Sequence, residues 1–138
     1  MKNRKLGNLD LNVSEIGLGC MSFAGFYDPT TKEESFKFLD KARDSGISFL
    51  DTAEMYGWGL SETIIGEYQQ LNNFSFNIAT KGGIVKGAAR GTNDNSEKGL
   101  RKALEGSLTR LKVEHIPLYY IHRLSLIHIS EPTRRTPI

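Results

Sequence analysis

The stretch Asp51-Thr52-Ala53-Glu54-Met55-Tyr56-Gly57 decides how the rest of the chain is interpreted. It follows the apolar run Ile47–Leu50, so a strand is predicted to end where an acid, a phenol and a glycine begin. Two later apolar runs also end on an ionisable residue: Phe76–Thr80 precedes Lys81, and Leu118–Ile121 precedes His122. In a parallel β/α barrel the carboxyl ends of the strands surround one mouth, where catalysis takes place. We therefore expect Asp51, Tyr56, Lys81 and His122 to share one site for proton transfer.

Strand and helix patterns alternate along the chain, which predicts a parallel sheet. A hairpin is predicted over residues 4–14, with Leu6–Gly7 and Leu11–Val13 extended on either side of a turn at Asn8–Asp10. The four strands predicted after it are Ile16–Met21, Ile47–Leu50, Phe74–Thr80 and Leu118–Ile121. The three helices predicted between them begin at Thr31, at a cap formed by Ser61–Glu62 and near Ser96.

Local signals mark the ends and the buried faces of these helices. Thr31 and Glu34 have the spacing of a capping box, and Gly46 supplies a left-handed stop. Asn72–Asn73 is predicted to end the second helix. The apolar positions expected to face the core are Ile64, Ile65, Tyr68 and Leu71 in the second helix, and Leu100, Ala103, Leu104, Leu108 and Leu111 in the third.

Four separated motifs resemble the signatures of the aldo-keto reductases. They are Arg4-x-Leu6-Gly7 with Val13–Gly19, the DTAEMYG stretch at 51–57, Lys81 within IATKGG, and His122-Arg123 within LYYIHR. The resemblance implies a (β/α)8 TIM barrel. Such a barrel takes ~250 residues, so 138 residues imply its N-terminal half only, made of the hairpin and about four β/α units in residues 1–123.

The resemblance also implies a role for each of the four ionisable residues. Tyr56 would be the general acid in the reduction of an aldehyde or ketone. A free tyrosine has a pKa of ~10, so its anion needs stabilising; Lys81 would supply a positive charge and Asp51 would hold that charge in place. His122 would hydrogen-bond the substrate carbonyl. The physical argument shows that this set of groups is sufficient for the reaction.

The cofactor that the resemblance implies is NADPH, with NADH possible. Gly19, Cys20, Met21 and Asp51 match positions that touch the nicotinamide ribose in the family, although Cys20 alone is equally interpreted as a small buried residue. A dinucleotide fingerprint of the form GxGxxG starting at Gly17 is excluded, because it would need glycine where Ser22 stands.

Several alternatives stay open on sequence alone. Phe23 and Trp58 would line a substrate pocket or pack as rim aromatics. Lys86 and Arg90 would approach a cofactor phosphate or form a solvated basic loop. The protein would be a small-molecule carbonyl reductase, a non-catalytic binding subunit of the same fold, or an inactive truncated fragment, and the oligomeric state is undetermined.

The final stretch Leu124–Ile138 does not continue the pattern. Ser125 stands where the family usually has aspartate, and Pro132 and Pro137 exclude a helix of useful length. The string resembles the translation of a sequencing adapter. We expect residues 124–138 to be a non-native or disordered tail that contributes nothing to the fold.

Composition sets the remaining bounds. The chain is 38% hydrophobic and 25% charged with a net charge of +2, which is typical of one soluble globular domain or less and gives no reason to expect nucleic acid or a membrane as partner. Cys20 is the only cysteine, so no intrachain disulfide forms. The N-terminus has no apolar signal core, and a cytoplasmic location is expected. No Cys/His spacing indicates a metal site.

Overall fold

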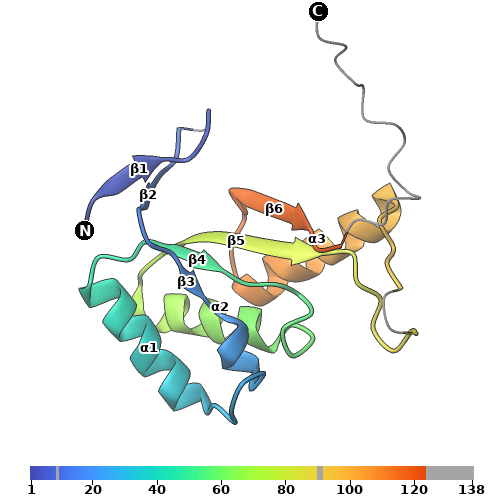
Figure 1. Cartoon of the computed structure of the whole chain (residues 1–138), viewed down its shortest axis with the longest axis horizontal. Coiled ribbons are helices and arrows are strands. Elements are labelled where there is room, and N and C mark those ends of the chain that lie inside the picture. The colour runs from blue at the N-terminus through green and yellow to red at the C-terminus, as the bar shows by residue number, and fades with distance from the viewer. Residues whose placement is uncertain (9, 90–91, 124–138) are drawn as a thin grey trace, which may run out of the picture.

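The computed structural model describes residues 1–8, 10–89 and 92–123. Its central sheet has the strand order β3 (Leu18–Gly19), β4 (Phe49–Asp51), β5 (Asn77–Gly82) and β6 (Leu118–Ile121), with every neighbouring pair parallel. The helices α1 (Lys32–Asp44), α2 (Leu60–Asn72) and α3 (Glu97–Leu111) connect successive strands and lie on one side of the sheet (Figure 1). The predicted β/α alternation is therefore confirmed. The prediction for residues 124–138 lies outside the described residues.

The N-terminal hairpin is confirmed, but its strands lie further apart along the sequence than predicted. β1 (Asn3–Lys5) pairs antiparallel with β2 (Asn12–Ser14). Leu6 and Gly7 belong to the connection, because Gly7 has a φ of +57° and the Leu6 amide donates to Leu11 O at 2.8 Å. Ser14 fixes the hairpin to the sheet, since its hydroxyl accepts from the Ser48 amide at 2.9 Å just before β4.

Helix α1 has both predicted terminal signals. The Thr31 hydroxyl accepts from the Glu34 amide at 3.2 Å, and the Glu34 carboxylate accepts from the Thr31 amide at 2.8 Å, so the capping box is complete. Gly46 has a φ of +78°, and the Ile47 amide beyond it donates to Ala42 O at 2.9 Å. These three bonds satisfy backbone groups at the two ends of the helix.

The predicted cap and apolar face of α2 are wrong in part. The helix begins at Leu60, and its N-cap is Gly59 with a φ of +95°. Ser61 and Glu62 do not cap it, because both are fully buried and their side chains bond to other elements. Leu71 is 72% exposed and faces away from the core. The predicted end is confirmed, since Asn73 takes a left-handed conformation with a φ of +47°.

Three strands differ from their predicted positions. β4 is Phe49–Asp51 rather than Ile47–Leu50, so Asp51 is its last residue. The strand predicted over Ile16–Met21 is reduced to β3, because the chain turns at Met21 into the short 3-10 helix η1 (Met21–Ala24). β5 begins at Asn77 rather than Phe74, since the Phe76 amide is taken by the Gln69 side chain at 2.8 Å. β5 continues to Gly82, so Lys81 lies inside the strand and not after it. β6 and the start of α3 near Ser96 are as predicted, and Ser96 is the N-cap of that helix.

The core lies between the sheet and the helices. Its buried apolar side chains come from every layer: Cys20, Phe23, Leu39, Leu50, Ile64, Ile65, Tyr68, Phe76, Ile78 and Leu111. Leu50 and Ile78 are paired across β4 and β5 and point towards the helices. Within the described residues no helix covers the opposite face of the sheet, where Tyr120 is 41% exposed (Figure 1). That open face carries the site.

In the described part of the chain, the helices are all too short or too polar to cross a lipid bilayer.

Candidate active site

Strand alternation places the predicted ionisable residues on the open face of the sheet. Asp51 ends β4 and pairs with Ala79, two residues before Lys81. Lys81 pairs in turn with Tyr120, two residues before His122. Because side chains two apart on a strand point to the same face, Asp51, Lys81 and His122 project to one side. Backbone bonds hold the three strand ends together, because the Thr52 amide donates to Ala79 O at 2.9 Å and the His122 amide donates to Gly82 O at 2.9 Å. The Cys20 amide, which donates to Asp51 O at 2.8 Å, adds the end of β3.

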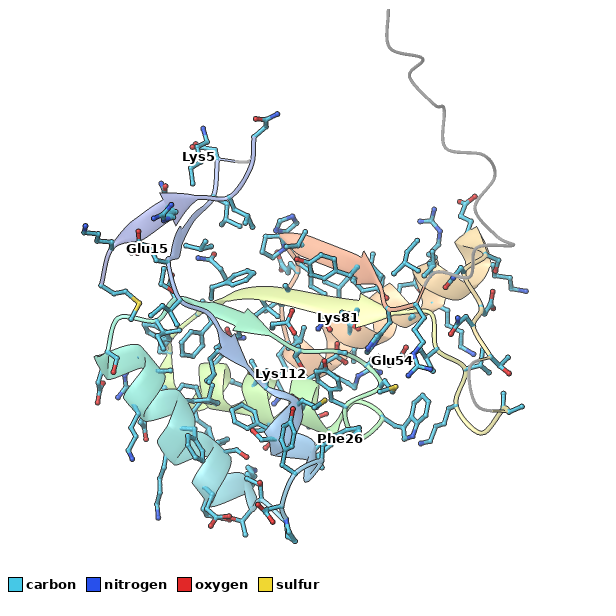
Figure 2. All side chains as sticks on the ribbon, viewed as in Figure 1. Lys5, Glu15, Phe26, Glu54, Lys81 and Lys112 are labelled. Atoms are coloured by element: carbon cyan, nitrogen blue, oxygen red, sulfur yellow. The ribbon has the colours of Figure 1, made fainter. Side chains whose placement is uncertain are left out.

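Lys81 is held at the centre of this group. Its ammonium forms an ion pair with the Asp51 carboxylate and donates to Thr52 O at 2.8 Å. Figure 2 labels the Lys81 side chain. It is only 17% exposed, whereas the side chain of Asp51 is 41% exposed. Charge-assisted bonds in a partly buried position fix an ammonium more firmly than surface pairing does. Lys81 is therefore a positioned positive charge.

Tyr56 lies beside that charge. Its hydroxyl is 3.5 Å from Lys81 Nζ, which is also 5.1 Å from the centre of the tyrosine ring. The ring meets His122 edge-on at 5.9 Å and Phe26 edge-on at the same centroid distance. The site thus brings together all four residues predicted from the sequence, and it places the phenol against a cation that can stabilise its anion.

His122 completes the group from β6. Burial lowers the pKa of His122, and the positive charges of Lys81 and Arg123 lower it further, while Asp51 opposes them. The imidazole is therefore neutral near neutral pH. Among the described residues no group hydrogen-bonds its buried Nδ1. Buried polar atoms in native proteins are normally paired, so a partner is expected for this nitrogen.

A turn after β4 carries Tyr56. The Glu54 amide donates to Lys81 O at 3.0 Å, and the Tyr56 amide donates to Ala53 O at 3.0 Å. Three consecutive residues with positive φ then reverse the chain: Gly57, Trp58 and Gly59. Trp58 is a bulky residue in this region, which costs backbone strain that the surrounding contacts must offset.

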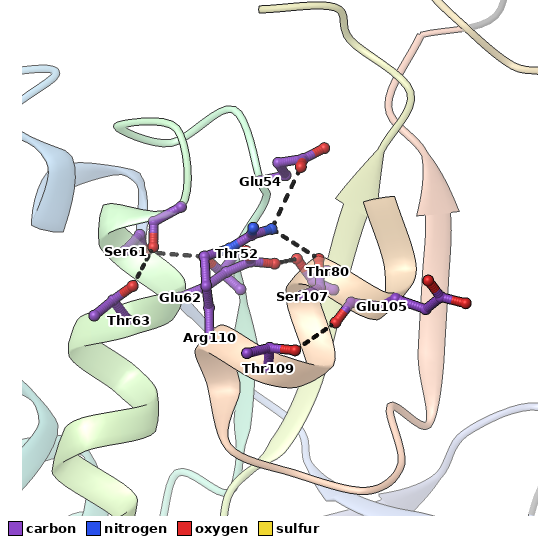
Figure 3. Close-up of polar contacts among 11 residues, drawn as sticks. Thr52, Glu54, Ser61, Glu62, Thr63, Thr80, Glu105, Ser107, Thr109 and Arg110 are labelled. Atoms are coloured by element: carbon purple, nitrogen blue, oxygen red, sulfur yellow. Dashed lines mark hydrogen bonds and ion pairs between the residues drawn. The ribbon is translucent and has the colours of Figure 1, made fainter. Parts of the chain in front are cut away.

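A second set of charged residues was missed by the sequence analysis. Glu62 of α2 is fully buried and accepts from Arg110 Nε at 2.7 Å and from the Thr80 hydroxyl at 2.6 Å (Figure 3). Arg110 also reaches Glu54 Oε1 at 3.4 Å. Burial raises the pKa of Glu54, and Arg110 partly offsets this. The signal was present in the sequence, since Glu62 and Arg110 are charges on the apolar faces of two neighbouring helices.

The residues predicted to touch a cofactor lie on the same edge as Asp51. Gly19 pairs with Asp51 across β3 and β4, is exposed, and has no heavy atom within 4 Å of the position a Cβ would take. Met21 is half-buried. Cys20 is fully buried, its amide and carbonyl bond to Asp51 O and to the Ser61 hydroxyl, and burial raises the pKa of its thiol. Cys20 therefore lies beneath the surface, where its backbone bonds hold the neighbouring residues Gly19 and Met21 in place.

The two aromatic residues considered for a pocket have different positions. Phe23 is 1% exposed and belongs to the core, so neither the pocket nor the rim alternative describes it. Trp58 is 38% exposed and its ring lies 5.8 Å from Lys86 Nζ. Lys86 therefore packs over an aromatic face at the rim. Arg90 lies outside the described residues.

Comparisons with known proteins place this arrangement in a family. The model of the aldo/keto reductase family matches residues 15–133. An uncharacterized oxidoreductase, YqkF, of Bacillus subtilis is 40% identical over 124 residues, which are 88% of this chain and 39% of that protein. The aldo-keto reductase yakc [NADP(+)] of Schizosaccharomyces pombe is 38% identical over 126 residues, with 88% of this chain and 36% of that protein covered.

A solved structure gives the same result for the fold. The aldo-keto reductase AKR11C1 from Bacillus halodurans, in its holo form, superposes with a TM-score of 0.80 at 34% identity. The match covers 94% of this chain and 42% of that one. The chain thus spans about two fifths of the length of the relatives it matches. The predicted family and its barrel fold are confirmed, and the structure is the first part of such a barrel.

Proposed function

Because this chain belongs to the aldo-keto reductase family, we propose that the protein is an oxidoreductase that reduces aldehydes or ketones to alcohols with NADPH, or alternatively NADH. One observation carries the proposal: Asp51, Tyr56, Lys81 and His122 meet at one strand edge, with the Tyr56 hydroxyl 3.5 Å from the Lys81 ammonium. Names of relatives add support, since one is called an oxidoreductase and another is named for NADP(+).

The residues present fit a reduced nicotinamide. Gly19 and Met21 leave an accessible edge beside Asp51, and the buried His122 Nδ1 has no partner in the described residues. When bound there, the cofactor would supply a hydride to the carbonyl carbon of the substrate. Residues 124–138 and any further chain lie outside the described structure, so the group that selects NADPH over NADH is not assigned.

The chain's own residues supply the proton. Tyr56 donates its hydroxyl proton to the carbonyl oxygen as the carbon gains the hydride, so the carbonyl becomes an alcohol and Tyr56 becomes a phenolate. The Lys81 ammonium stabilises that phenolate, and Asp51 keeps the ammonium in place. Neutral His122 donates a hydrogen bond to the carbonyl oxygen and orients the substrate. Solvent then returns a proton to Tyr56.

Replacing Tyr56 with phenylalanine tests the proposal. We expect Y56F to lower kcat for aldehyde reduction by about 10²- to 10⁴-fold, the range in which a positioned general acid contributes. The assay follows NADPH oxidation by the full protein that the gene encodes. Tyr27→Phe is the matched control, because Tyr27 is 73% exposed and has no place in the site.

Two outcomes would contradict the proposed function. Full turnover in Y56F would exclude Tyr56 as the acid. Absence of turnover by the wild-type protein with a panel of aldehydes and ketones would favour the binding-subunit alternative, provided that the protein still binds NADPH.

A further inference from the structure

Arg110 contacts the Tyr56 turn at both of its ends. Its guanidinium Nη2 lies 3.4 Å from Glu54 Oε1, two residues before Tyr56 (Figure 3). Its aliphatic stem packs against Gly59, three residues after Tyr56, where a Cβ would lie only 2.4 Å from Arg110 Cδ. One side chain from α3 thus brackets the segment that carries Tyr56, although 54 positions of sequence separate the two residues.

Buried partners hold Arg110 itself in place. Its Nε donates to Glu62 Oε2 at 2.7 Å, and the other oxygen of that carboxylate accepts from the Thr80 hydroxyl at 2.6 Å. Glu62 is fully buried, and the Arg110 side chain is 25% exposed. A guanidinium presents several donors in a rigid fork, so it can bond Glu62 and Glu54 at the same time. The Arg110 side chain is therefore held by Glu62 of α2 and, through Glu62, by Thr80 of β5.

The same strand holds the turn from the other face. The Thr80 hydroxyl donates to Glu62, the carboxylate that also holds Arg110. The next residue is Lys81. Its carbonyl accepts from the Glu54 amide at 3.0 Å, and its ammonium pairs with Asp51. The turn needs such support, because the φ values of Gly57, Trp58 and Gly59 are all positive. The 3.5 Å separation of Tyr56 and Lys81 is at the outer limit of a hydrogen bond, so a small displacement of the turn would break it.

We propose that Arg110 is a positioning residue for Tyr56, acting through Glu54 and Gly59 rather than through contact with substrate or cofactor. The inference rests on the proposed function, in which Tyr56 is the general acid. Arg110 sets where the hydroxyl lies relative to Lys81, and the Glu54 carboxylate is the contact through which it acts on the residues before Tyr56.

The decisive variant is Glu54→Ala, because it removes the Glu54 contact and leaves the buried Arg110–Glu62 pair in place. We expect kcat to fall about 10- to 100-fold, the cost of a displacement near 1 Å in a positioned group, with KM for the cofactor unchanged. Arg110→Lys keeps a positive charge for Glu62 but lacks the fork that reaches Glu54, so it should lower kcat similarly. Arg101→Lys is the matched control, since Arg101 pairs with Glu97 at 3.0 Å on the exposed face of the same helix.

Two readouts separate positioning from a general structural effect. In the Tyr56→Phe background, Glu54→Ala should cause no further loss of kcat, because the hydroxyl it positions is absent. Hydrogen exchange of the backbone amides of residues 54–60 should become faster in Glu54→Ala and stay unchanged in Arg101→Lys. The inference is overturned if Glu54→Ala lowers kcat equally in both backgrounds, or if exchange in the turn does not change.

Failure of the proposed function has a different signature. If Y56F retains full activity, Tyr56 is not the acid, and the kinetic part of the inference fails with it. Faster exchange in Glu54→Ala would then still establish that Arg110 and Glu54 hold the turn. Should Arg110→Lys fail to fold, Glu54→Ala alone decides the question.

Discussion

Replacing Gly66 with alanine tests the contact between α2 and α3, on which the position of Arg110 depends. A Cβ at Gly66 would lie 2.3 Å from the carbonyl oxygen of Arg110, and 2.8 and 2.9 Å from the carbonyl carbon and Cα of Leu111. All three are backbone atoms, so no side-chain rotation relieves the overlap. The two helices must move apart, and α3 carries Arg110 with it.

Two opposing physical causes decide whether Gly66→Ala raises or lowers the free energy of unfolding: overpacking and helix propensity. The closest approach falls about 1.1 Å short of the 3.4 Å at which ordinary contact begins, and overpacking of this kind typically costs about 1–3 kcal/mol. Alanine is the better helix former by about 1 kcal/mol, which acts in the opposite direction. Because the overlap is with backbone, we expect a net loss of about 1–2 kcal/mol in the free energy of unfolding.

Urea unfolding followed by circular dichroism measures the change. A loss of this size should lower the urea midpoint by about 1 M. Glu105→Ala is the control on the neighbouring helix, because Glu105 is exposed and its side chain takes part in no hydrogen bond or ion pair within the described residues. The control should change stability by about 0.5 kcal/mol or less. A Gly66→Ala protein as stable as wild type would refute the close helix approach.

Two further predictions concern buried polar groups. The Tyr119 hydroxyl is buried with no hydrogen-bond partner among the described residues, and burial raises the pKa of Tyr119 to about 12. Tyr119→Phe should therefore raise the free energy of unfolding, measured with denaturant, by about 1 kcal/mol. A lower free energy of unfolding in Tyr119→Phe would show that the hydroxyl has a hydrogen-bond partner. The lowered pKa of His122 means that the unfolded chain binds a proton that the folded chain resists, so stability present above about pH 6.5 should decline as pH falls below it. Urea titrations at pH 7.5 and 5.5 should show a smaller decline in His122→Gln than in wild type, and equal declines would contradict the assignment.

Features set by local chemistry were predictable from the sequence. The predictions that are confirmed are the capping box of Thr31 and Glu34, the Gly46 stop and the helix start near Ser96, and each depends on residues within a few positions of each other. The grouping of the ionisable residues could also be predicted from the sequence. Each of these residues follows or ends an apolar run, and parallel strands bring their carboxyl ends together.

Features set by distant partners were not predictable. Ser61 has the composition of a helix cap, but its hydroxyl donates to Cys20 O, 41 residues earlier. Glu62 was assigned to the same cap, although its carboxylate is fully buried against Arg110 and Thr80. A local pattern cannot distinguish a capping side chain from one that bonds across the core, since both place a polar group before an apolar run. The start of β5 shifted for the same reason, because the Phe76 amide bonds to a glutamine of α2.

The two charged networks lie on opposite faces of the same strand, and this separation has a functional consequence. Thr80 faces the helices and joins Glu62 and Arg110, while Lys81 faces the mouth and joins Asp51 and Tyr56. Since successive residues of a strand point to opposite faces, a change on the helix side is expected to displace Tyr56 while the charges of Asp51 and Lys81 beside it stay in place. A change at Asp51 or Lys81 would instead alter the charge next to the phenol directly. If the proposed function holds, β5 separates the position of Tyr56 from the electrostatic stabilisation of its anion, and variants on the two faces of β5 should affect kcat by different physical causes.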